Sequence, residues 1–204
     1  LSEQGVYKIS QDRNGLIWYL TTNGLFTYDK KFDLNKFVFA YTAEDKTDYV
    51  TDFIEGDNGI FWLLTQKYLH KYDSQQKKIT HSLNLHENQG KVRLNKVIEY
   101  RRHLLVSSSL GVFVVSKQLD RVKLLPPIVE DEADKARIVY ALHIYNQSEL
   151  YLGTYNGLFA LHVSELLEFF EDEKTTLSYR TIDRSLSVWS FKPNAQELYV
   201  GSQK

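Results

Sequence analysis

The sequence predicts an all-β fold, a β-propeller made of four-stranded antiparallel blades, with about four and a half blades in its 204 residues. Three observations predict it: a repeat of about 44 residues, two-residue alternation of apolar and polar side chains inside each repeat, and glycine-containing turns between the alternating stretches. Four short strands in about 40–45 residues are typical of a propeller blade. Since half a blade cannot close a ring, we expect these residues to be part of a longer, seven-bladed propeller.

The repeat is clearest in its first two copies. Four pairs of identical residues lie 44 positions apart: Gly15 and Gly59, Trp18 and Trp62, Thr21 and Thr65, and Tyr28 and Tyr72. Later copies keep a threonine or serine before the third strand, which gives the series Thr21, Thr65, Ser108, Thr154 and Ser202. We therefore predict blades at residues 6–45, 50–89, 93–125 and 137–180, and an incomplete fifth blade at residues 187–204.

We assign the repeated residues to folding rather than to ligand binding. Asp12 can accept backbone N–H bonds within its own turn, where Gly15 supplies a positive φ. The tryptophans fill the wide gap between twisted blades. The residues assigned in this way are Asp12, Gly15, Trp18, Thr21, Gly24, Gly59, Trp62, Thr65, Gly111, Thr154 and Gly157.

Two stretches interrupt the repeat. Residues 126–134 form an acidic connector before the fourth blade, and residues 162–187 form an insert after the third strand of that blade. In the insert, Leu166, Phe169 and Phe170 lie at i, i+3 and i+4, and Ser164 is placed to cap the start of a short helix. We expect this helix either to replace an outer strand or to offer a docking face to the rest of the protein.

The composition excludes several classes of function. The absence of cysteine excludes a disulfide scaffold, thiol catalysis and zinc bound by cysteine. A net charge of −1 leaves no basic surplus for binding nucleic acid, and no apolar run reaches the length of a membrane helix. Of the six histidines, only His81 and His86 are close in sequence, and an odd offset on a strand puts them on opposite faces. We therefore expect neither a metal nor a cofactor.

Candidate ligand-binding residues follow from the geometry of propellers. The loops that lead into each first strand and the turns between second and third strands lie on one face, around the central channel. Aromatic rings there can stack on sugars, and arginine can bind a carboxylate through two hydrogen bonds. For any one residue, a solvated rim is the alternative. The candidates are Asn23, Tyr49, Lys67, Arg93, Arg137, Tyr155, Asn156 and Arg184.

The first copy resembles a known repeat. Its core reads Asp-x-x-Gly-x-x-Trp-x-x-Thr-x-x-Gly-Leu and is followed by Tyr28-Asp29, which is similar to the two-component regulator propeller repeat. The second copy has Tyr68 in place of the last glycine, the third lacks the tryptophan, and the fourth keeps Gly-Thr-x-x-Gly-Leu. The resemblance covers the whole chain as a series of blades.

The resemblance implies the periplasmic sensor region of a bacterial signalling protein, joined to the membrane by segments outside these residues. In that family the output domain is a histidine kinase or a GGDEF-type diguanylate cyclase. Many members resemble sensors of oligosaccharides. For the full-length protein we expect a homodimer. Neither a kinase histidine box nor a GGDEF sequence occurs here. We therefore expect an input module that is not itself an enzyme and that binds an oligosaccharide or a related small molecule.

Two other functions are left open. Propeller lyases and hydrolases carry acid and base groups on the channel face, so a histidine converging with a carboxylate there would favour an enzyme. A protein-interaction or dimerisation scaffold would need an exposed apolar patch, for which Leu166, Phe169 and Phe170 are the candidates.

Overall fold

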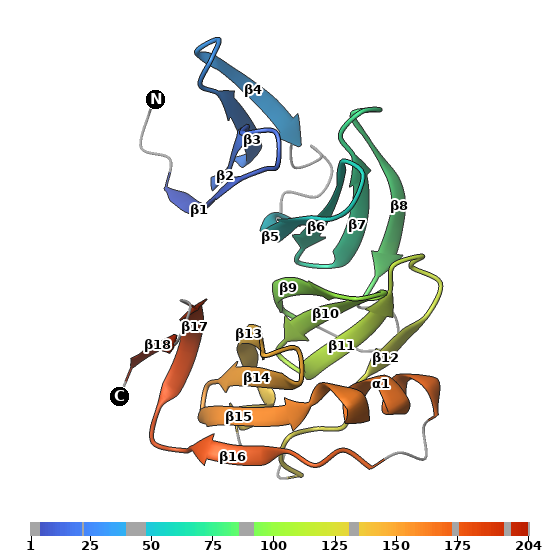
Figure 1. The fold of residues 1–204 in the computed structure, drawn as a ribbon, viewed down its shortest axis with the longest axis vertical. Coiled ribbons are helices and arrows are strands. Elements are labelled where there is room, and N and C mark those ends of the chain that lie inside the picture. The colour runs from blue at the N-terminus through green and yellow to red at the C-terminus, as the bar shows by residue number, and fades with distance from the viewer. Residues whose placement is uncertain are drawn as a thin grey trace. The chain divides into compact units, whose positions relative to one another are not determined.

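The computed structural model describes residues 5–21, 23–39, 48–85, 92–130, 135–172, 176–193 and 197–203 (Figure 1). These residues form five antiparallel sheets, four with four strands and one with two. Consecutive strands are neighbours in every sheet. The prediction of an all-β fold built from four-stranded antiparallel sheets is confirmed, and we number the sheets blade 1 to blade 5 along the chain.

The strands are short and evenly spaced. Blade 1 contains β1 (Val6–Gln11), β2 (Ile17–Thr21), β3 (Gly24–Asp29) and β4 (Leu34–Phe39). Blade 2 contains β5 (Val50–Glu55), β6 (Ile60–Thr65), β7 (Tyr68–Asp73) and β8 (Lys78–Asn84). Blade 3 contains β9 (Leu94–Tyr100), β10 (His103–Ser108), β11 (Gly111–Ser116) and β12 (Val122–Leu124). Blade 4 contains β13 (Val139–Tyr145), β14 (Glu149–Thr154), β15 (Gly157–His162) and β16 (Arg180–Asp183), and blade 5 contains β17 (Ser187–Pro193) and β18 (Leu198–Gln203).

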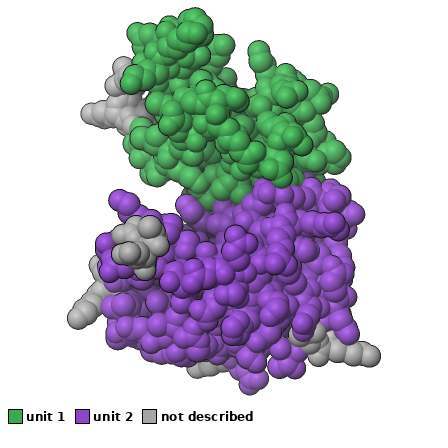
Figure 2. Space-filling view, viewed as in Figure 1, with its two compact units in different colours: residues 1–90 green, residues 91–204 purple. Residues whose placement is uncertain are grey.

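The chain divides into two compact units, Leu1–Gly90 and Lys91–Lys204 (Figure 2). The first unit contains blades 1 and 2. Its core is aromatic, because the indole of Trp18 in β2 stacks on the ring of Phe61 in β6 with centroids 3.9 Å apart. Leu20 and Leu25 are buried in the same cluster. Trp18 therefore fills the space between the two blades of this unit.

The second unit contains blades 3, 4 and 5, and its core is aliphatic. Leu105 of β10 and Val112 of β11 are buried in one cluster with Leu150 and Leu152 of β14. The side-chain amide of Asn95 in β9 also donates to the carbonyl of Val139 in β13 at 2.8 Å. Blades 3 and 4 are thus joined by apolar packing and by a polar link between their first strands.

The insert in blade 4 forms α1 (Val163–Glu171), which precedes β16 in the sequence. Because β16 pairs with β15 as the fourth strand, the helix does not replace an outer strand. The expected cap at Ser164 is wrong: the residue before the helix is His162, whose side chain makes no capping bond. The helix still begins there because burial of its apolar face stabilises it more than a cap does.

The expected exposed patch on α1 is also wrong. Leu166 and Phe170 are 0% and 2% exposed, and Phe169 packs partly against the same core. Lys123 Nζ on β12 donates to the carbonyl of Phe169 at 3.1 Å, and the guanidinium of Arg121 donates to the carbonyl of Phe170. These cations bind the last turn of the helix, where its dipole is negative, and hold α1 on blade 3.

The repeated threonine or serine stabilises the turn between the second and third strands. In blade 4, Thr154 Oγ1 donates to the carbonyl of Gly157 at 2.9 Å and accepts the N–H of Asn156 at 3.2 Å. The same two bonds occur at Thr21 and Ser108. The glycine that ends each of these three turns has a positive φ, and the glycines are Gly24, Gly111 and Gly157.

Blade 2 lacks that glycine but keeps both bonds, since Thr65 Oγ1 also accepts the N–H of Lys67 at 3.4 Å. Tyr68 takes the position, and its backbone N–H donates to Thr65 Oγ1 at 2.9 Å. Thr65 Oγ1 in turn donates to the carbonyl of Tyr68 at 3.2 Å. The hydroxyl thus supports a turn in which the last residue needs no positive φ.

The turn between β1 and β2 is organised by one carboxylate. Asp12 Oδ1 accepts the N–H groups of Asn14 and Leu16, each at 2.9 Å, and Asp12 Oδ2 accepts the indole N–H of Trp18 at 2.8 Å. Gly15 lies in the same turn with a φ of 82°. The backbone bonds are those expected from the sequence, whereas the indole bond was not anticipated.

Candidate binding site

A β-bulge occurs at the same place in the first strand of every blade that the structure describes. The pairing with the second strand shifts register at one residue, as between Val139 and Ala141 in blade 4. A bulge re-aims the side chain of the extra residue. The five bulged residues are Tyr7, Thr51, Asn95, Tyr140 and Trp189.

The loop before the first strand is tied to the turn between the second and third strands. In blade 4 the N–H of Tyr155 donates to the carbonyl of Ile138 at 3.1 Å. In blade 3 the N–H of Ser109 donates to the carbonyl of Arg93 at 2.9 Å. Both kinds of loop therefore lie at the same end of their blade, next to the bulge.

Three aromatic side chains meet at this end of blades 4 and 5. The rings of Tyr140 and Trp189, both bulged residues, are stacked with centroids 4.1 Å apart and an interplanar angle of 24°. The ring of Tyr155 lies 6.4 Å from Trp189 and 6.5 Å from Tyr140. Trp189 is 44% exposed and Tyr155 is 37% exposed. We call these three residues the aromatic site.

Cationic groups act on the aromatic site. Lys135 Nζ lies 4.7 Å from the centroid of the Tyr155 ring, a distance suited to a cation–π contact. Burial raises the pKa of the Tyr140 phenol, the positive charge of Arg93 opposes this, and Tyr155 raises the pKa further. The Tyr140 hydroxyl therefore stays protonated at neutral pH and can both donate and accept a hydrogen bond.

An open cavity of about 380 Å³ adjoins the aromatic site. Tyr155, Asn156 and Arg184 line it together with Trp189. The structure thus brings three of the expected ligand-binding residues together, and Arg93 acts on the same group of rings. Arg137 ends the 3-10 helix η1 (Lys135–Arg137), just before β13.

The other three expected residues lie in the first unit. The N–H of Asn23 donates to Thr21 Oγ1 at 3.1 Å, and the N–H of Lys67 donates to Asp48 Oδ1 at 3.0 Å. The carbonyl of Tyr49 accepts the N–H of Gln66 at 3.2 Å. Each therefore belongs to the loop end of its own blade, and its role in ligand binding stays a prediction.

Tyr140 and Trp189 were not among the ligand-binding residues predicted from the sequence. Trp189 stands in a first strand, whereas the tryptophans of the repeat stand in second strands. That difference is the signal that would have separated Trp189 from the core residues. Tyr140 gave no such signal, because the direction of its side chain depends on a bulge that the sequence pattern does not show.

The expectation about a metal site concerns the histidines, above all His81 and His86. Among the described residues, no group of three or more histidine, aspartate or glutamate side chains lies close enough together to hold a metal ion. His81 lies on β8, and His86 lies outside the described residues. None of the helices formed by the described residues has the length and hydropathy needed to span a membrane.

Neither the known protein families nor the curated proteins gave a match to this sequence. Several solved structures are similar to this chain. The extracellular domain described as that of the hybrid two component system BT3049 from B. thetaiotaomicron has a TM-score of 0.69 at 15% identity, covering 98% of this chain and 27% of that one. The corresponding domain of BT4673 from the same organism has a TM-score of 0.54 at 14% identity, covering 98% and 30%.

A propeller of another kind is similar as well. A catalytically inactive virginiamycin B lyase from Staphylococcus aureus has a TM-score of 0.67 at 11% identity, covering 99% of this chain and 64% of that one. The fold is a β-propeller. The chain spans less than a third of the two component system structures, and at these identities the likeness establishes the fold alone.

Proposed function

We propose that this β-propeller is the extracytoplasmic sensor region of a bacterial membrane signalling protein, that it binds an oligosaccharide, and that it relays binding to a cytoplasmic output domain. The observation that carries the proposal is the aromatic site, with its cavity and neighbouring cations. The likeness to extracellular domains of two component systems supports the sensor role. We further propose a ring of seven blades and a homodimer in the whole protein.

The chemistry of the aromatic site favours a saccharide with acidic groups. The stacked pair of Tyr140 and Trp189 offers a flat apolar surface of the kind that covers the C–H face of a sugar ring. Arg93 and Lys135 supply positive charge beside it. A uronate presents both an apolar face and a carboxylate, so it matches this combination better than a neutral sugar does.

Sensing needs more than binding. A ligand shifts a two-state equilibrium only by the difference between its affinities for the two states. The aromatic site is built from blades 4 and 5, since Tyr140 and Tyr155 belong to one and Trp189 to the other. A sugar stacked across both blades would favour the arrangement that holds them together, which gives binding a means of affecting the rest of the protein.

The test is a titration of the full chain with oligogalacturonates and, as neutral partners, cello-oligosaccharides, followed by intrinsic fluorescence. Trp18 and Trp62 are each 3% exposed, so a change caused by a surface ligand reports on Trp189. A ligand at 100 times its Kd also adds about 2.7 kcal/mol to the stability, which a thermal melt detects.

We expect Trp189→Ala to weaken oligogalacturonate binding about tenfold or more. We expect Arg93→Ala to weaken oligogalacturonate binding while leaving any binding of the neutral cello-oligosaccharides unchanged. Phe32→Ala is the matched control, because Phe32 is also an exposed aromatic residue with a lysine ammonium above its ring, at 5.4 Å. Oligogalacturonate binding that survives Trp189→Ala would show that the aromatic site is not the binding site. No binding of oligogalacturonates or of cello-oligosaccharides would refute a saccharide sensor.

A further inference from the structure

The stacked pair in the aromatic site has two outer faces. The rings of Tyr140 and Trp189 lie at an interplanar angle of 24° with centroids 4.1 Å apart, so each ring covers one face of the other. The two uncovered faces therefore lie on opposite sides of the pair. Trp189 lines the cavity of about 380 Å³, and Tyr140 is not among the described residues that line it. The cavity thus lies on the Trp189 side of the pair.

The cavity has a cation of its own. Arg184 lines it, and none of the described residues that line it is acidic. The guanidinium of Arg184 lies 5.3 Å from the centroid of the buried Phe159 ring, a cation–π contact that limits the positions of the long side chain. The turn after β16 is held by Asp183 Oδ1, which accepts both the N–H and the hydroxyl of Ser185 at 2.7 Å. This wall of the cavity is therefore held in place by the chain itself and offers positive charge to a ligand.

The Tyr140 side of the pair faces a different arginine. β13, which carries Tyr140, contacts both β9 of blade 3 and β17 of blade 5. Since Trp189 lies on β17, the outer face of Tyr140 is turned toward blade 3. Arg93 comes just before β9, its N–H donates to Ser109 Oγ at 3.0 Å, and its positive charge acts on the Tyr140 phenol. Each outer face of the stacked pair thus has its own arginine, Arg184 on one side and Arg93 on the other.

We propose that the aromatic site binds a linked chain of uronic acid residues and discriminates against a single one. One sugar lies in the cavity on the outer face of Trp189 with its carboxylate on Arg184, and another sugar of the same chain lies against Tyr140 with its carboxylate on Arg93. A single sugar cannot contact both outer faces, because the two stacked rings lie between them. Linked sugars bind more tightly than separate ones, because the second contact becomes intramolecular. This inference rests on the proposed function and adds to it the length of the ligand and the role of Arg184.

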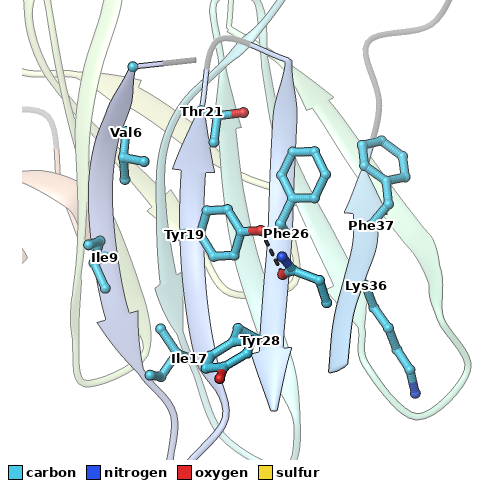
Figure 3. Close-up of a pocket in the computed structure, with 11 residues that line it drawn as sticks. Val6, Ile9, Ile17, Tyr19, Thr21, Phe26, Tyr28, Lys36 and Phe37 are labelled. Carbon is cyan, nitrogen blue, oxygen red and sulfur yellow. Dashed lines mark hydrogen bonds between the residues drawn. The ribbon is translucent and has the colours of Figure 1, made fainter. Parts of the chain in front are cut away.

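A larger groove on blade 1 offers a comparison (Figure 3). It has a volume of about 860 Å³, and its lining is mostly apolar. Phe26 stacks on Tyr19 with ring centroids 5.4 Å apart, and the Tyr19 hydroxyl already donates to Asn35 Oδ1 at 2.6 Å, the bond drawn as a dashed line. Lys36 is the one cation among the described residues that line the groove, and its side chain points away from the ring of Phe37. The groove therefore has aromatic rings but lacks a cation on each side of a stacked pair, so it matches a chain of uronates less well.

The test measures affinity as a function of ligand length. Galacturonate, digalacturonate and trigalacturonate are titrated into the full chain by isothermal titration calorimetry, together with the methyl ester of trigalacturonate, which keeps the sugar rings and lacks the charges. The variant is Arg184→Gln, which removes the cation of the cavity. Lys36→Gln is the matched control, because it removes the cation of the groove on blade 1 in the same way. Arg184→Lys keeps a positive charge and so separates the loss of charge from damage to the turn.

We expect trigalacturonate to bind about tenfold or more tightly than galacturonate. Arg184→Gln should weaken trigalacturonate binding about tenfold, Arg184→Lys should weaken it less, and neither should affect binding of the methyl ester. Equal affinities for galacturonate and trigalacturonate would overturn the inference, and so would an effect of Arg184→Gln no larger than that of Lys36→Gln. Both results would leave the proposed saccharide sensor standing. Absence of binding by any of the three galacturonates would overturn the inference together with the proposed acidic saccharide.

Discussion

The bond between Asp12 and Trp18 makes a quantitative prediction about the stability of blade 1. Asp12→Ala removes the acceptor of three N–H groups, and two of them, from Leu16 and Trp18, are partly buried. The indole of Trp18 is only 3% exposed, so its N–H cannot turn to water. A buried donor left without a partner costs about 1–3 kcal/mol. We expect Asp12→Ala to lower the free energy of unfolding by about 2–4 kcal/mol.

A double-mutant cycle isolates the indole bond from the rest of that loss. In a Trp18→Phe background the indole N–H is already gone, so Asp12→Ala should cost about 1–2 kcal/mol less than it does alone. The assay is urea unfolding of the full chain, followed by far-UV circular dichroism. Asp57→Ala is the control in the corresponding turn of blade 2, where the side chain forms an exposed ion pair with Arg13, and it should change stability by at most about 0.5 kcal/mol. If the effects of Asp12→Ala and Trp18→Phe simply add, the indole bond does not stabilise the blade.

Three further predictions concern stability. Burial lowers the pKa of His103 in the folded state below its value in the unfolded chain. The folded state therefore loses stability as the pH falls below about 6.5. His103→Phe removes this titration, so it should lessen the fall in Tm between about pH 7.5 and pH 5.5. Thr154→Val should cost about 1–2 kcal/mol in urea unfolding, because it removes both turn bonds of a buried hydroxyl, and Thr154→Ser should cost less. Gly157→Ala should lower the free energy of unfolding more than Gly15→Ala does in the same assay. A Cβ at position 157 would lie 2.7 Å from the backbone carbonyl oxygen of Asp183. A Cβ at position 15 would lie no closer than 3.6 Å to any atom, and that atom belongs to a flexible side chain.

The sequence was sufficient to predict the architecture because the repeat is made of local chemistry. Asp12 bonds within its own turn, and Thr154 bonds to atoms two and three residues away. Such contacts depend only on nearby residues, so a repeated pattern of side chains implies a repeated turn. The alternation of side chains then gives the strands between the turns.

Only one of the three residues of the aromatic site was predicted from the sequence, for a physical reason. Tyr155 lies in a turn that the repeat locates, whereas Tyr140 and Trp189 stand at shifts in strand register. Hydrophobic alternation predicts which side chains share a face only while the register is regular. The exposed patch predicted on α1 was wrong, because an apolar stripe at helical spacing does not show whether the surface it packs on belongs to the same chain.

The bulged residue differs from blade to blade, whereas most of the buried positions of the repeat keep an apolar side chain. The buried side chains that pack between blades 1 and 2 and between blades 3 and 4 are mostly large and apolar. The bulged position varies more, and it carries Tyr7, Thr51, Asn95, Tyr140 and Trp189 in the five blades. Substitution there changes the surface at the loop end of a blade, and in blade 3 it would also remove the bond from Asn95 to the carbonyl of Val139 in blade 4. In blades 4 and 5 the bulged residues stack on each other, and under the proposed function this stacked pair is the surface that contacts the ligand.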